Sequence, residues 1–265
     1  MELFSIASGS SGNCIMVGSD NTKVLVDVGI SMKRIKEGLL SVDLSFDDIN
    51  GIVITHEHAD HIKGLGVIAR KHGLPMYATR KTIEAIRRDR TLGDYDDSLF
   101  YSIRPDEPFD IGDIEVEANR IWHDAADPVC YTFKCQGKKA SVATDMGDYD
   151  DYIVEKLSDS DIMLIESNHD IRMLEAGPYP YYLKRRILSD HGHLSNERSG
   201  SLILRLLNSH IKGIALGHLS HENNYPDLAF ETVKNILLDN EFTNDIRDFN
   251  LQVARRDCPS VHFVA

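Results

Sequence analysis

The stretch GIVITHEHADH, Gly51–His61, places three histidines and two acidic residues directly after a run of β-branched residues. Such a run indicates a buried strand. Because alternate residues share a face of a strand, His56 and His58 are expected to point the same way, with Asp60 and His61 following at the turn into a helix. Imidazole nitrogens suit zinc, iron or manganese. The stretch therefore predicts a metal site at the end of a strand.

Four further predicted strands carry a residue of the same metal-binding type at or near their ends. The strands and residues are Lys23–Gly29 with Asp27, Ile114–His123 with His123, Lys139–Asp145 with Asp145, and Ile211–His218 with His218. Strand ends that open into a common cleft are where open sheets build their sites. A single histidine at a strand end is usually structural, but five strands that end in this way favour one shared site.

The residues divide into two sets of ligands. His56 and His58 suit one metal ion, with His123 as the third ligand. Asp60 and His61 suit a second ion, with His218 as the third ligand, and Asp145 would bridge the two. Asp27 is expected to support the ligands through hydrogen bonds. Two metal ions about 3.5–4 Å apart suit in-line attack on a phosphodiester.

Composition narrows the class of protein. The chain has 265 residues, of which 42% are hydrophobic, enough to bury a substantial core. It has 29 Lys plus Arg against 42 Asp plus Glu, and the resulting formal charge of −13 does not favour nucleic-acid binding unless basic residues are clustered locally. The four cysteines lack zinc-finger spacing, so reduced thiols in a cytoplasmic protein are expected. No signal peptide or membrane span is predicted.

Short apolar segments alternate with helical patterns along the chain. Besides the strands above, the sequence predicts strands over Leu3–Ser8, Asn13–Ser19, Ser98–Pro105, Val129–Cys135 and Asp161–Asn168. Helices are predicted over His61–Lys71, Thr79–Arg90, Ser195–Asn208 and Pro226–Leu238. Several strands precede the first helices and the pattern repeats in the second half. This order predicts two packed sheets with helices outside, in one domain over 1–265.

These motifs resemble those of the metallo-β-lactamase superfamily. The H-x-H-x-D-H signature stands here as His56-Glu57-His58-Ala59-Asp60-His61. Asp27 before it, and His123, Asp145 and His218 after it, fall in the superfamily's order. The resemblance covers essentially the whole chain. It implies an α/β fold, a four-layer αββα sandwich of two mixed sheets with helices outside, and a dinuclear metal site at one edge.

Five further segments resemble the YycJ/WalJ group of this superfamily. They are SGSSGNC at Ser8–Cys14, ATDMG at Ala143–Gly147, LIESNHD at Leu164–Asp170, GHLSNE at Gly192–Glu197 and LGHLSHENN at Leu216–Asn224. The group is similar to RNase Z and to the β-CASP nucleases but has no separate β-CASP domain. The resemblance implies a dinuclear-metal-dependent phosphodiesterase, a 5′-to-3′ exonuclease on double-stranded DNA with a role in DNA repair. Its cofactors would be two divalent ions, Zn²⁺, Mn²⁺ or Fe²⁺, and its partner DNA with a 5′ phosphate.

The resemblance also implies catalytic roles. Asp60 would orient a metal-activated hydroxide. In RNase Z-like enzymes a histidine near a helix start contacts the scissile phosphate and a glutamate steadies it; by resemblance these are His193 and Glu166. A histidine that is hydrogen-bonded to a carboxylate has a fixed tautomer and a raised pKa, which suits a general acid. His191, two residues earlier, is expected to be a bystander, and the role of His169 stays open.

Other segments are candidates for binding phosphate. Ser195 and Asn196 can cap the following helix, whose free N–H groups favour an anion. The small-residue turn that contains Ser10, Ser11 and Asn13 either binds a terminal phosphate or is a plain hairpin turn.

Two basic segments, Lys184–Arg186 and Arg80–Arg90, either form a basic patch or are solvated helix faces. Trp122 is expected in the core rather than as a stacking platform.

Two alternatives to the nuclease remain open. A phosphodiesterase that acts on small cyclic phosphates would use the same metals and need no basic patch, which suits the acidic charge. The other alternative is a regulatory protein that binds metal and a partner but catalyses little, although both sets of metal ligands are complete. The sequence leaves the native metal and the oligomeric state undecided, with a homo-oligomer as one option.

Overall fold

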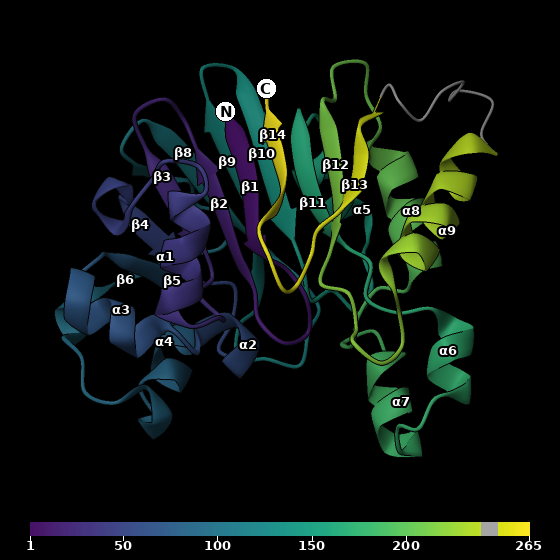
Figure 1. Ribbon diagram of the computed structural model, residues 1–265, viewed down its shortest axis with the longest axis horizontal. Helices are drawn as coiled ribbons and strands as arrows, with labels where there is room; N and C mark the ends of the chain where they lie inside the picture. Colours follow the sequence, from purple (N-terminus) through teal and green to yellow (C-terminus); the bar gives the residue numbers. More distant parts are fainter. Residues whose placement is uncertain (240–248) are drawn as a thin grey trace.

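The protein, seen here as a computed structural model that describes residues 1–239 and 249–265, contains two sheets packed face to face (Figure 1). Within these residues each sheet has seven strands. The first sheet has the order β14 (Ser260–Val264), β1 (Glu2–Ala7), β2 (Cys14–Gly18), β3 (Lys23–Val26), β4 (Gly51–Val53), β5 (Met76–Thr79) and β6 (Phe100–Ile103). The second has the order β13 (Leu251–Val253), β12 (Gly213–Gly217), β11 (Ile162–Glu166), β10 (Lys138–Ala143), β9 (Val129–Cys135), β8 (Ile114–Arg120) and β7 (Phe109–Ile111).

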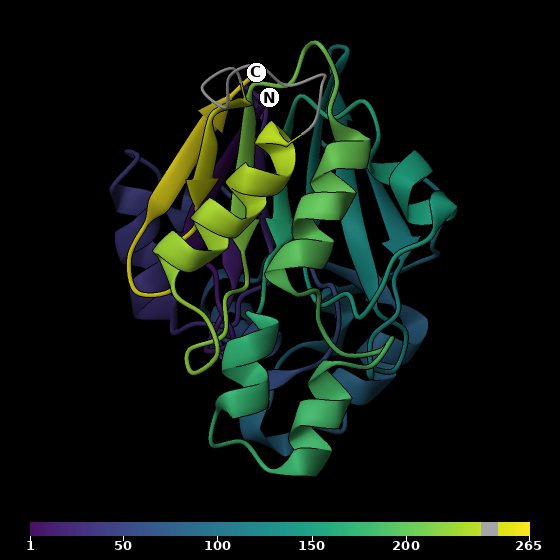
Figure 2. The ribbon, with the colours of Figure 1, turned by 90° about the vertical axis from the view of Figure 1, so that its right-hand side faces the viewer.

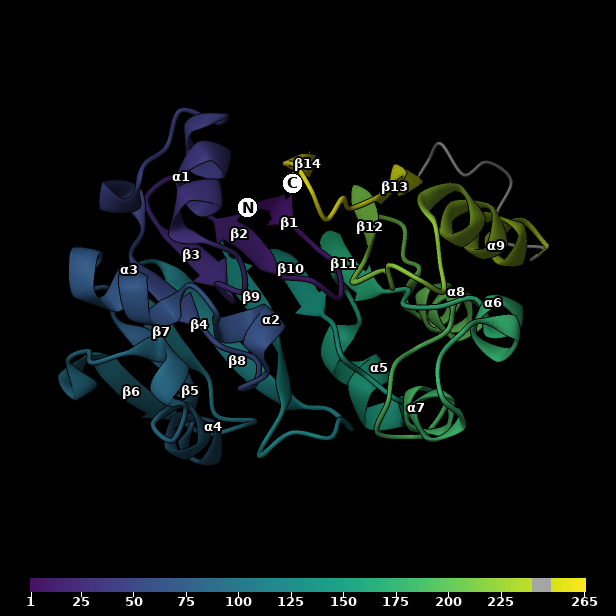
Figure 3. The ribbon, with the colours of Figure 1, turned by 60° about the horizontal axis from the view of Figure 1, so that its bottom comes forward.

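Both sheets are mixed, as predicted. In the first, β1, β2 and β3 pair antiparallel, whereas β3 to β6 pair parallel. In the second, β7 to β10 pair antiparallel, whereas β10 to β13 pair parallel. The parallel strands β3, β4, β10, β11 and β12 end at the same edge of the sandwich, and this edge carries the polar residues discussed below (Figure 3).

Helices cover the outer faces of the two sheets (Figures 1 and 2). The first sheet is covered by α1 (Met32–Leu40), α3 (Leu65–His72) and α4 (Arg80–Ile86), and the second by α5 (Asp151–Leu157), α8 (Asn196–Leu206) and α9 (Pro226–Leu238). The short α2 (Ala59–Ile62) lies at the polar edge, and α6 (Ile171–Ala176) and α7 (Tyr181–Ile187) form a hairpin that projects beyond it. Single 3-10 turns lie at Phe46–Asp48, Arg90–Leu92 and Asp97–Leu99. In the described ranges no helix has the length and apolar character needed to cross a membrane.

Three apolar clusters correspond to the three interfaces of a four-layer sandwich. The middle cluster contains inward-facing residues of both sheets, among them Val26 and Phe133. Ile35 and Ile68 pack under the helices of the first sheet, and Leu202 and Val233 under those of the second. Each such buried side chain contributes roughly 1.5–3 kcal/mol. The predicted α/β class and αββα sandwich are confirmed.

The helix predicted over His61–Lys71 is divided into α2 and α3. The carbonyl of Asp60 accepts a hydrogen bond from the backbone N–H of Asn13 at 2.8 Å, so it is not used within a helix. The N–H of Gly64 instead donates to the carbonyl of Val28 at 2.8 Å. Contacts with the end of β3 therefore interrupt the helix just after the metal-binding motif.

Other boundaries differ from the prediction for local reasons. The segment Thr79–Arg90 is not one helix, because Thr79 closes β5 and caps α4, which ends at Ile86. The strand predicted over Ile114–His123 ends at Arg120, so His123 lies in the following loop. The helix predicted over Pro226–Leu238 is confirmed, and α8 begins directly after its predicted cap Ser195.

Candidate metal centre and its surroundings

The seven predicted metal ligands converge at the polar edge of the sandwich. They come from the loop after β4, from α2, and from the loops that follow β8, β10 and β12. Neighbouring nitrogen and oxygen atoms lie within 4.8 Å of one another in overlapping groups. The candidate ligands are His56, His58, Asp60, His61, His123, Asp145 and His218.

The first group consists of His56, His58 and His123. The Nδ1 atom of His123 lies 3.0 Å from the carbonyl oxygen of Gly192, to which it donates, so Nε2 carries the lone pair. This Nε2 lies 3.3 Å from Nδ1 of His58. Nε2 of His56 is buried and has no hydrogen-bond partner among the described residues, while burial keeps the pKa of this ring well below its usual value. An unpartnered nitrogen on a neutral ring is what a metal ion requires.

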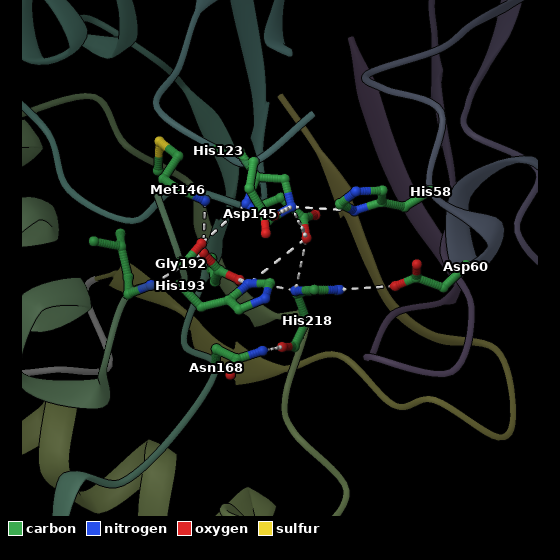
Figure 4. A network of polar contacts seen from close by, with 12 residues as sticks. His58, Asp60, His123, Asp145, Met146, Asn168, Gly192, His193 and His218 are labelled. Carbon is green, nitrogen blue, oxygen red and sulfur yellow. Dashed lines mark hydrogen bonds and ion pairs between the residues drawn. The ribbon is translucent and has the colours of Figure 1, made fainter. Parts of the chain in front are cut away.

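The second group consists of Asp60, His61 and His218. Nδ1 of His61 lies 2.7 Å from a carboxylate oxygen of Asp27, which fixes the ring and turns its Nε2 toward the cluster. That Nε2 is 3.5 Å from Oδ2 of Asp60, and Nε2 of His218 is 3.4 Å from the same oxygen (Figure 4). One carboxylate oxygen and two imidazole nitrogens thus point at one small volume.

Asp145 lies between the two groups. Its Oδ2 is 3.2 Å from Nε2 of His61, and its Oδ1 is 3.7 Å from Nε2 of His123. Burial alone would raise the pKa of the Asp145 carboxyl, but the rings of His218 and His61 hold it well below the usual range. The position is the one expected for a carboxylate that serves both groups.

Three residues of the site adopt a left-handed backbone. Asp27, Asp145 and His218 have φ angles of 60°, 60° and 55°. They follow the ends of β3, β10 and β12. Residues other than glycine are rarely found there, and a conformation of this kind costs about 1–3 kcal/mol. Each strand therefore ends in a sharp reversal that sets the direction of one polar side chain.

Asp27 occupies the supporting position predicted for it. Its Oδ1 accepts a hydrogen bond from the backbone N–H of Thr55 at 2.9 Å, and its Oδ2 accepts one from the Thr55 hydroxyl at 2.8 Å. The same Oδ2 contacts His61. Asp27 thereby links the end of β3 to the start and the end of the histidine motif.

Because Gly29 has no side chain, the backbone after β3 can lie in direct contact with the backbone of Asp60. A Cβ atom at position 29 would lie 1.6 Å from the carbonyl oxygen of Asp60, so the two backbones could not keep their places. We expect Gly29→Ala to lower the free energy of unfolding by about 2 kcal/mol or more and to weaken metal binding. Thermal unfolding and calorimetric metal titration measure the two effects.

The matched control is Gly73→Ala. Gly73 has a φ of 61° at the end of α3, but an added Cβ there meets no atom within 4 Å. Gly73→Ala should cost about 1 kcal/mol of stability and leave metal affinity unchanged. Equal metal affinities for the two variants would contradict the importance of the close approach at Gly29.

Glu166 is completely buried and makes four hydrogen bonds. Its Oε1 accepts from Nδ1 of His193 and from Nδ1 of His218, each at 2.8 Å. Its Oε2 accepts from the backbone N–H groups of Met146 and Leu194 at 2.8 and 3.2 Å. Burial would raise the pKa of this carboxyl, but the two histidines lower it to about 2.

The contact between Glu166 and His193 was expected from the sequence, but the contact with His218 was not. One carboxylate therefore orients both a candidate ligand and the candidate proton donor.

His193 reaches the cluster from the loop before α8. Its side chain is 16% exposed, and its backbone N–H donates to the carbonyl of Ile187 at 3.1 Å. Its ring centre lies 5.1 Å from that of His123 and 5.4 Å from that of His218. Because Nδ1 is bonded to Glu166, the ring is fixed with its other nitrogen available for a proton at the mouth of the site.

The turn between β1 and β2 is hydrogen-bonded to residues of the cluster. Asn13 accepts a hydrogen bond from the N–H of Gly9 at 3.0 Å, and its Nδ2 lies 3.3 Å from Nε2 of His61. The hydroxyl of Ser8 accepts from the backbone N–H of His218 at 2.9 Å. Ser10 and Ser11 are exposed at the tip of the turn, where a substrate could reach them.

The two residues expected at the start of α8 have different roles. Ser195 caps the helix, since its hydroxyl accepts from the N–H of Arg198 at 3.2 Å. Asn196 is wholly buried, and its side chain bonds to Ser167 at 2.7 Å and to Asn224 at 2.8 Å. The prediction that Asn196 contacts phosphate is therefore wrong: the side chain holds together the loops after β11 and β12.

The two histidines left aside by the motif also differ. His191 is exposed, and its carbonyl accepts from the N–H of Asp124 at 3.2 Å. His169 is buried, neither of its ring nitrogens has a hydrogen-bond partner in the described residues, and burial lowers its pKa to about 4.

Trp122 and most basic side chains of the two basic segments lie at the surface. Trp122 is 44% exposed, so the expectation that it lies in the core is wrong, because β8 ends before it. In the segment Arg80–Arg90, Arg80 pairs with Glu84 and Arg87 with Asp97 on exposed surface. Lys184–Arg186 lies in α7, close to the site.

The sequence of the chain is similar to one family model and to several known proteins. The family model described as "Beta-lactamase superfamily domain" matches residues 22–211. The chain is 41% identical to Exodeoxyribonuclease YycJ of Bacillus anthracis, with 89% of each chain covered. It is 42% identical to Exodeoxyribonuclease WalJ of Streptococcus pneumoniae serotype 2, with 88% of this chain and 86% of that protein covered.

A solved structure shows the same fold at low identity. The metallo-β-lactamase fold protein YhfI from Bacillus subtilis superimposes with a TM-score of 0.72 and 15% identity, with 99% of this chain and 98% of that chain covered.

Proposed function

Since the chain belongs to the beta-lactamase superfamily, in the family that contains YycJ and WalJ, we propose that this hydrolase degrades double-stranded DNA from a 5′ end as a dinuclear-metal-dependent phosphodiesterase. Two relatives that match it over most of their length are named exodeoxyribonucleases, which supports a DNA substrate. We also propose the whole of 1–265 as one catalytic domain. The four free thiols of the chain favour a reducing cytoplasm as its compartment.

The proposed ligand sets follow the two groups of side chains. His56, His58 and His123 would hold one ion. Asp60, His61 and His218 would hold the second, with Asp145 shared. The unpartnered nitrogen of His56 supports this assignment. Zn²⁺, Mn²⁺ and Fe²⁺ all suit such a set of imidazoles and carboxylates, and bound ions would activate water and neutralise phosphate charge.

The observation that carries the proposal is the pair His193–Glu166. Cleavage of a phosphodiester leaves an alkoxide, which needs a proton. A buried carboxylate at 2.8 Å accepts a hydrogen bond from Nδ1 of the His193 ring and so fixes the tautomer and orientation of the ring, which stands at the mouth of the cluster. His193 is therefore the proposed general acid and Glu166 its positioning residue. Asp60 would orient the attacking water.

Phosphate binding on the approach side would fall to the turn between β1 and β2. Ser10 and Ser11 carry exposed hydroxyls there, and Asn13 fixes the turn against Asp60 and His61. Exposed hydroxyl groups at such a turn can donate hydrogen bonds to a terminal phosphate. Ser195, as the cap of α8, keeps the start of that helix directed at the same region.

A nuclease assay tests the proposal. Duplex oligonucleotides labelled at the 5′ or at the 3′ end, with and without a 5′ phosphate, are incubated with the protein in Mn²⁺, Zn²⁺ or Mg²⁺. We expect mononucleotides to be released from the 5′ end, and faster when the 5′ phosphate is present. Hydrolysis of bis(p-nitrophenyl) phosphate without cleavage of any nucleic acid would refute the nuclease and favour a small phosphodiester substrate.

A further inference from the structure

The hairpin of α6 and α7 lies beside the candidate active site. It lies between the β11 segment that carries Glu166 and the loop that carries His193. Figure 2 shows it projecting beyond one end of the two sheets. Few of its residues belong to the core: Leu174 and Ile187 are buried, whereas most of the others are exposed or half-buried.

The hairpin is held firmly to the site. Arg186 makes a two-pronged ion pair with Asp124, the residue that follows His123. The carbonyl of Ile187 accepts from the N–H of His193 at 3.1 Å. The ammonium group of Lys184 donates to the carbonyl of Glu175 at 2.7 Å and so joins the two helices. The surface of α7 therefore has a fixed place relative to the cluster.

The exposed face of α7 is aromatic. Tyr181 and Tyr182 are each 75% exposed, more than any other large apolar or aromatic side chain in the described residues. Exposed rings that pack against nothing are unfavourable in water, and tyrosine is enriched where proteins bind partners. Tyr182 is one helical turn, roughly 6 Å, before Arg186 and hence close to the site.

The same surface is basic. The segment Ile171–Leu188 has four basic residues, Arg172, Lys184, Arg185 and Arg186, and one acidic residue, Glu175, in a chain whose net charge is −13. Arg185 is exposed and lies on the helix beside both tyrosines. Rings beside cations, next to a site that faces phosphodiesters, form the combination with which proteins hold unpaired nucleic acid.

We propose that Tyr181, Tyr182 and Arg185 form a binding surface for single-stranded nucleic acid, with bases stacked on the two rings and a phosphate beside the guanidinium. The surface rests on the proposed function, because it would hold an unpaired stretch of the same substrate that is cleaved at the cluster. Base faces inside a duplex are covered by neighbouring pairs, so the rings select the unpaired part of a substrate. A surface that bound a protein partner would not need the hydrogen bond that joins α7 to the loop of His193.

Binding of fluorescein-labelled oligo(dT), measured by anisotropy in EDTA, tests this surface. The double variant Tyr181→Ala/Tyr182→Ala is expected to raise Kd for oligo(dT), and for a duplex with a 3′ overhang, about tenfold for each stacked base lost. Binding of a blunt duplex should change little. Tyr101→Ala is the control, since Tyr101 is 52% exposed on the edge strand β6.

The charge is tested separately. Arg185→Gln should reduce the slope of log K against log salt for oligo(dT) by about 0.7, as expected for the loss of one phosphate contact on a single strand. The control Lys134→Gln removes one charge at the end of β9 far from the site and should leave the slope unchanged. Both variants and the tyrosine variant should hydrolyse bis(p-nitrophenyl) phosphate at wild-type rates, which shows that the cluster is intact.

The outcomes separate the two proposals. If the double tyrosine variant binds oligo(dT) as tightly as Tyr101→Ala, the surface is overturned, whatever the nuclease assay gives. If the wild-type protein binds no oligonucleotide, the surface is likewise overturned. If binding depends on the tyrosines but no metal supports cleavage, the surface stands and the proposed nuclease fails.

Discussion

Asp60→Ala is expected to reduce kcat/KM for duplex DNA about a thousandfold or more and to lower the metal content by about one ion per chain. Oδ2 of Asp60 lies 3.5 Å from Nε2 of His61 and 3.4 Å from Nε2 of His218, so it completes one group of candidate ligands, and Asp60 is also the residue proposed to orient the attacking water. Loss of this carboxylate removes both functions at once. Hydrolysis of labelled duplex and metal analysis of the purified variant measure them.

The control for this variant is Asp161→Ala. Asp161 is also a largely buried aspartate, but it bonds to Lys138 and to the backbone of Lys139 at the start of β11, the opposite end of that strand from Glu166. Asp161→Ala should lower thermal stability while keeping metal content and kcat. Wild-type metal content in Asp60→Ala, together with normal cleavage, would show that Asp60 is not part of the centre.

His193→Ala is expected to lower kcat for DNA by about 10²–10⁴ while metal content stays at the wild-type level. The effect should depend on the leaving group. A nucleoside alkoxide needs a proton as it departs, whereas p-nitrophenolate is stable without one. Hydrolysis of bis(p-nitrophenyl) phosphate by His193→Ala should therefore fall far less than cleavage of DNA.

Two further variants distinguish proton transfer by His193 from other roles of this residue. His191→Ala changes the exposed histidine two residues earlier and should leave both substrates unaffected. Glu166→Gln should reduce both activities, because Glu166 Oε1 holds the candidate ligand His218 as well as His193, each at 2.8 Å. Equal losses of both activities in His193→Ala would assign that residue to substrate or metal binding instead of proton transfer.

The sequence predicted the parts of the fold that are encoded locally. The β-branched run before the histidine motif and the apolar periodicity of α9 are strong signals, and both elements are found. The short strands β5, β7, β13 and β14 were missed. Strands β5, β13 and β14 pair with partners that are distant in the sequence, as when Glu2 and Leu3 pair with Val264 and Phe263, whereas β7 forms a hairpin with β8 but has only three residues. A few residues without clear periodicity do not reveal such partners.

The candidate site was also predicted only in part, because some of its contacts depend on how distant segments pack. His56 and His58 could be recognised because they follow a buried β-branched run at alternate positions, and the ends of other predicted strands indicated His123, Asp145 and His218, whose order agrees with that of the superfamily. The double role of Glu166 could not be read in this way. Its contacts with His193 and His218 depend on how β11 packs beside β12 and on the turn of the loop before α8.

The distribution of the ligands along the chain has a consequence during synthesis. His56, His58, Asp60 and His61 are made early, but they meet Asp145 and His218 only after the second sheet has formed and docked on the first. A nascent chain that ends after β6 holds three histidines and one aspartate of the cluster without the partners that close either group. The candidate metal cluster is therefore completed late in synthesis, because it needs residues from both sheets, and a partly made chain lacks it.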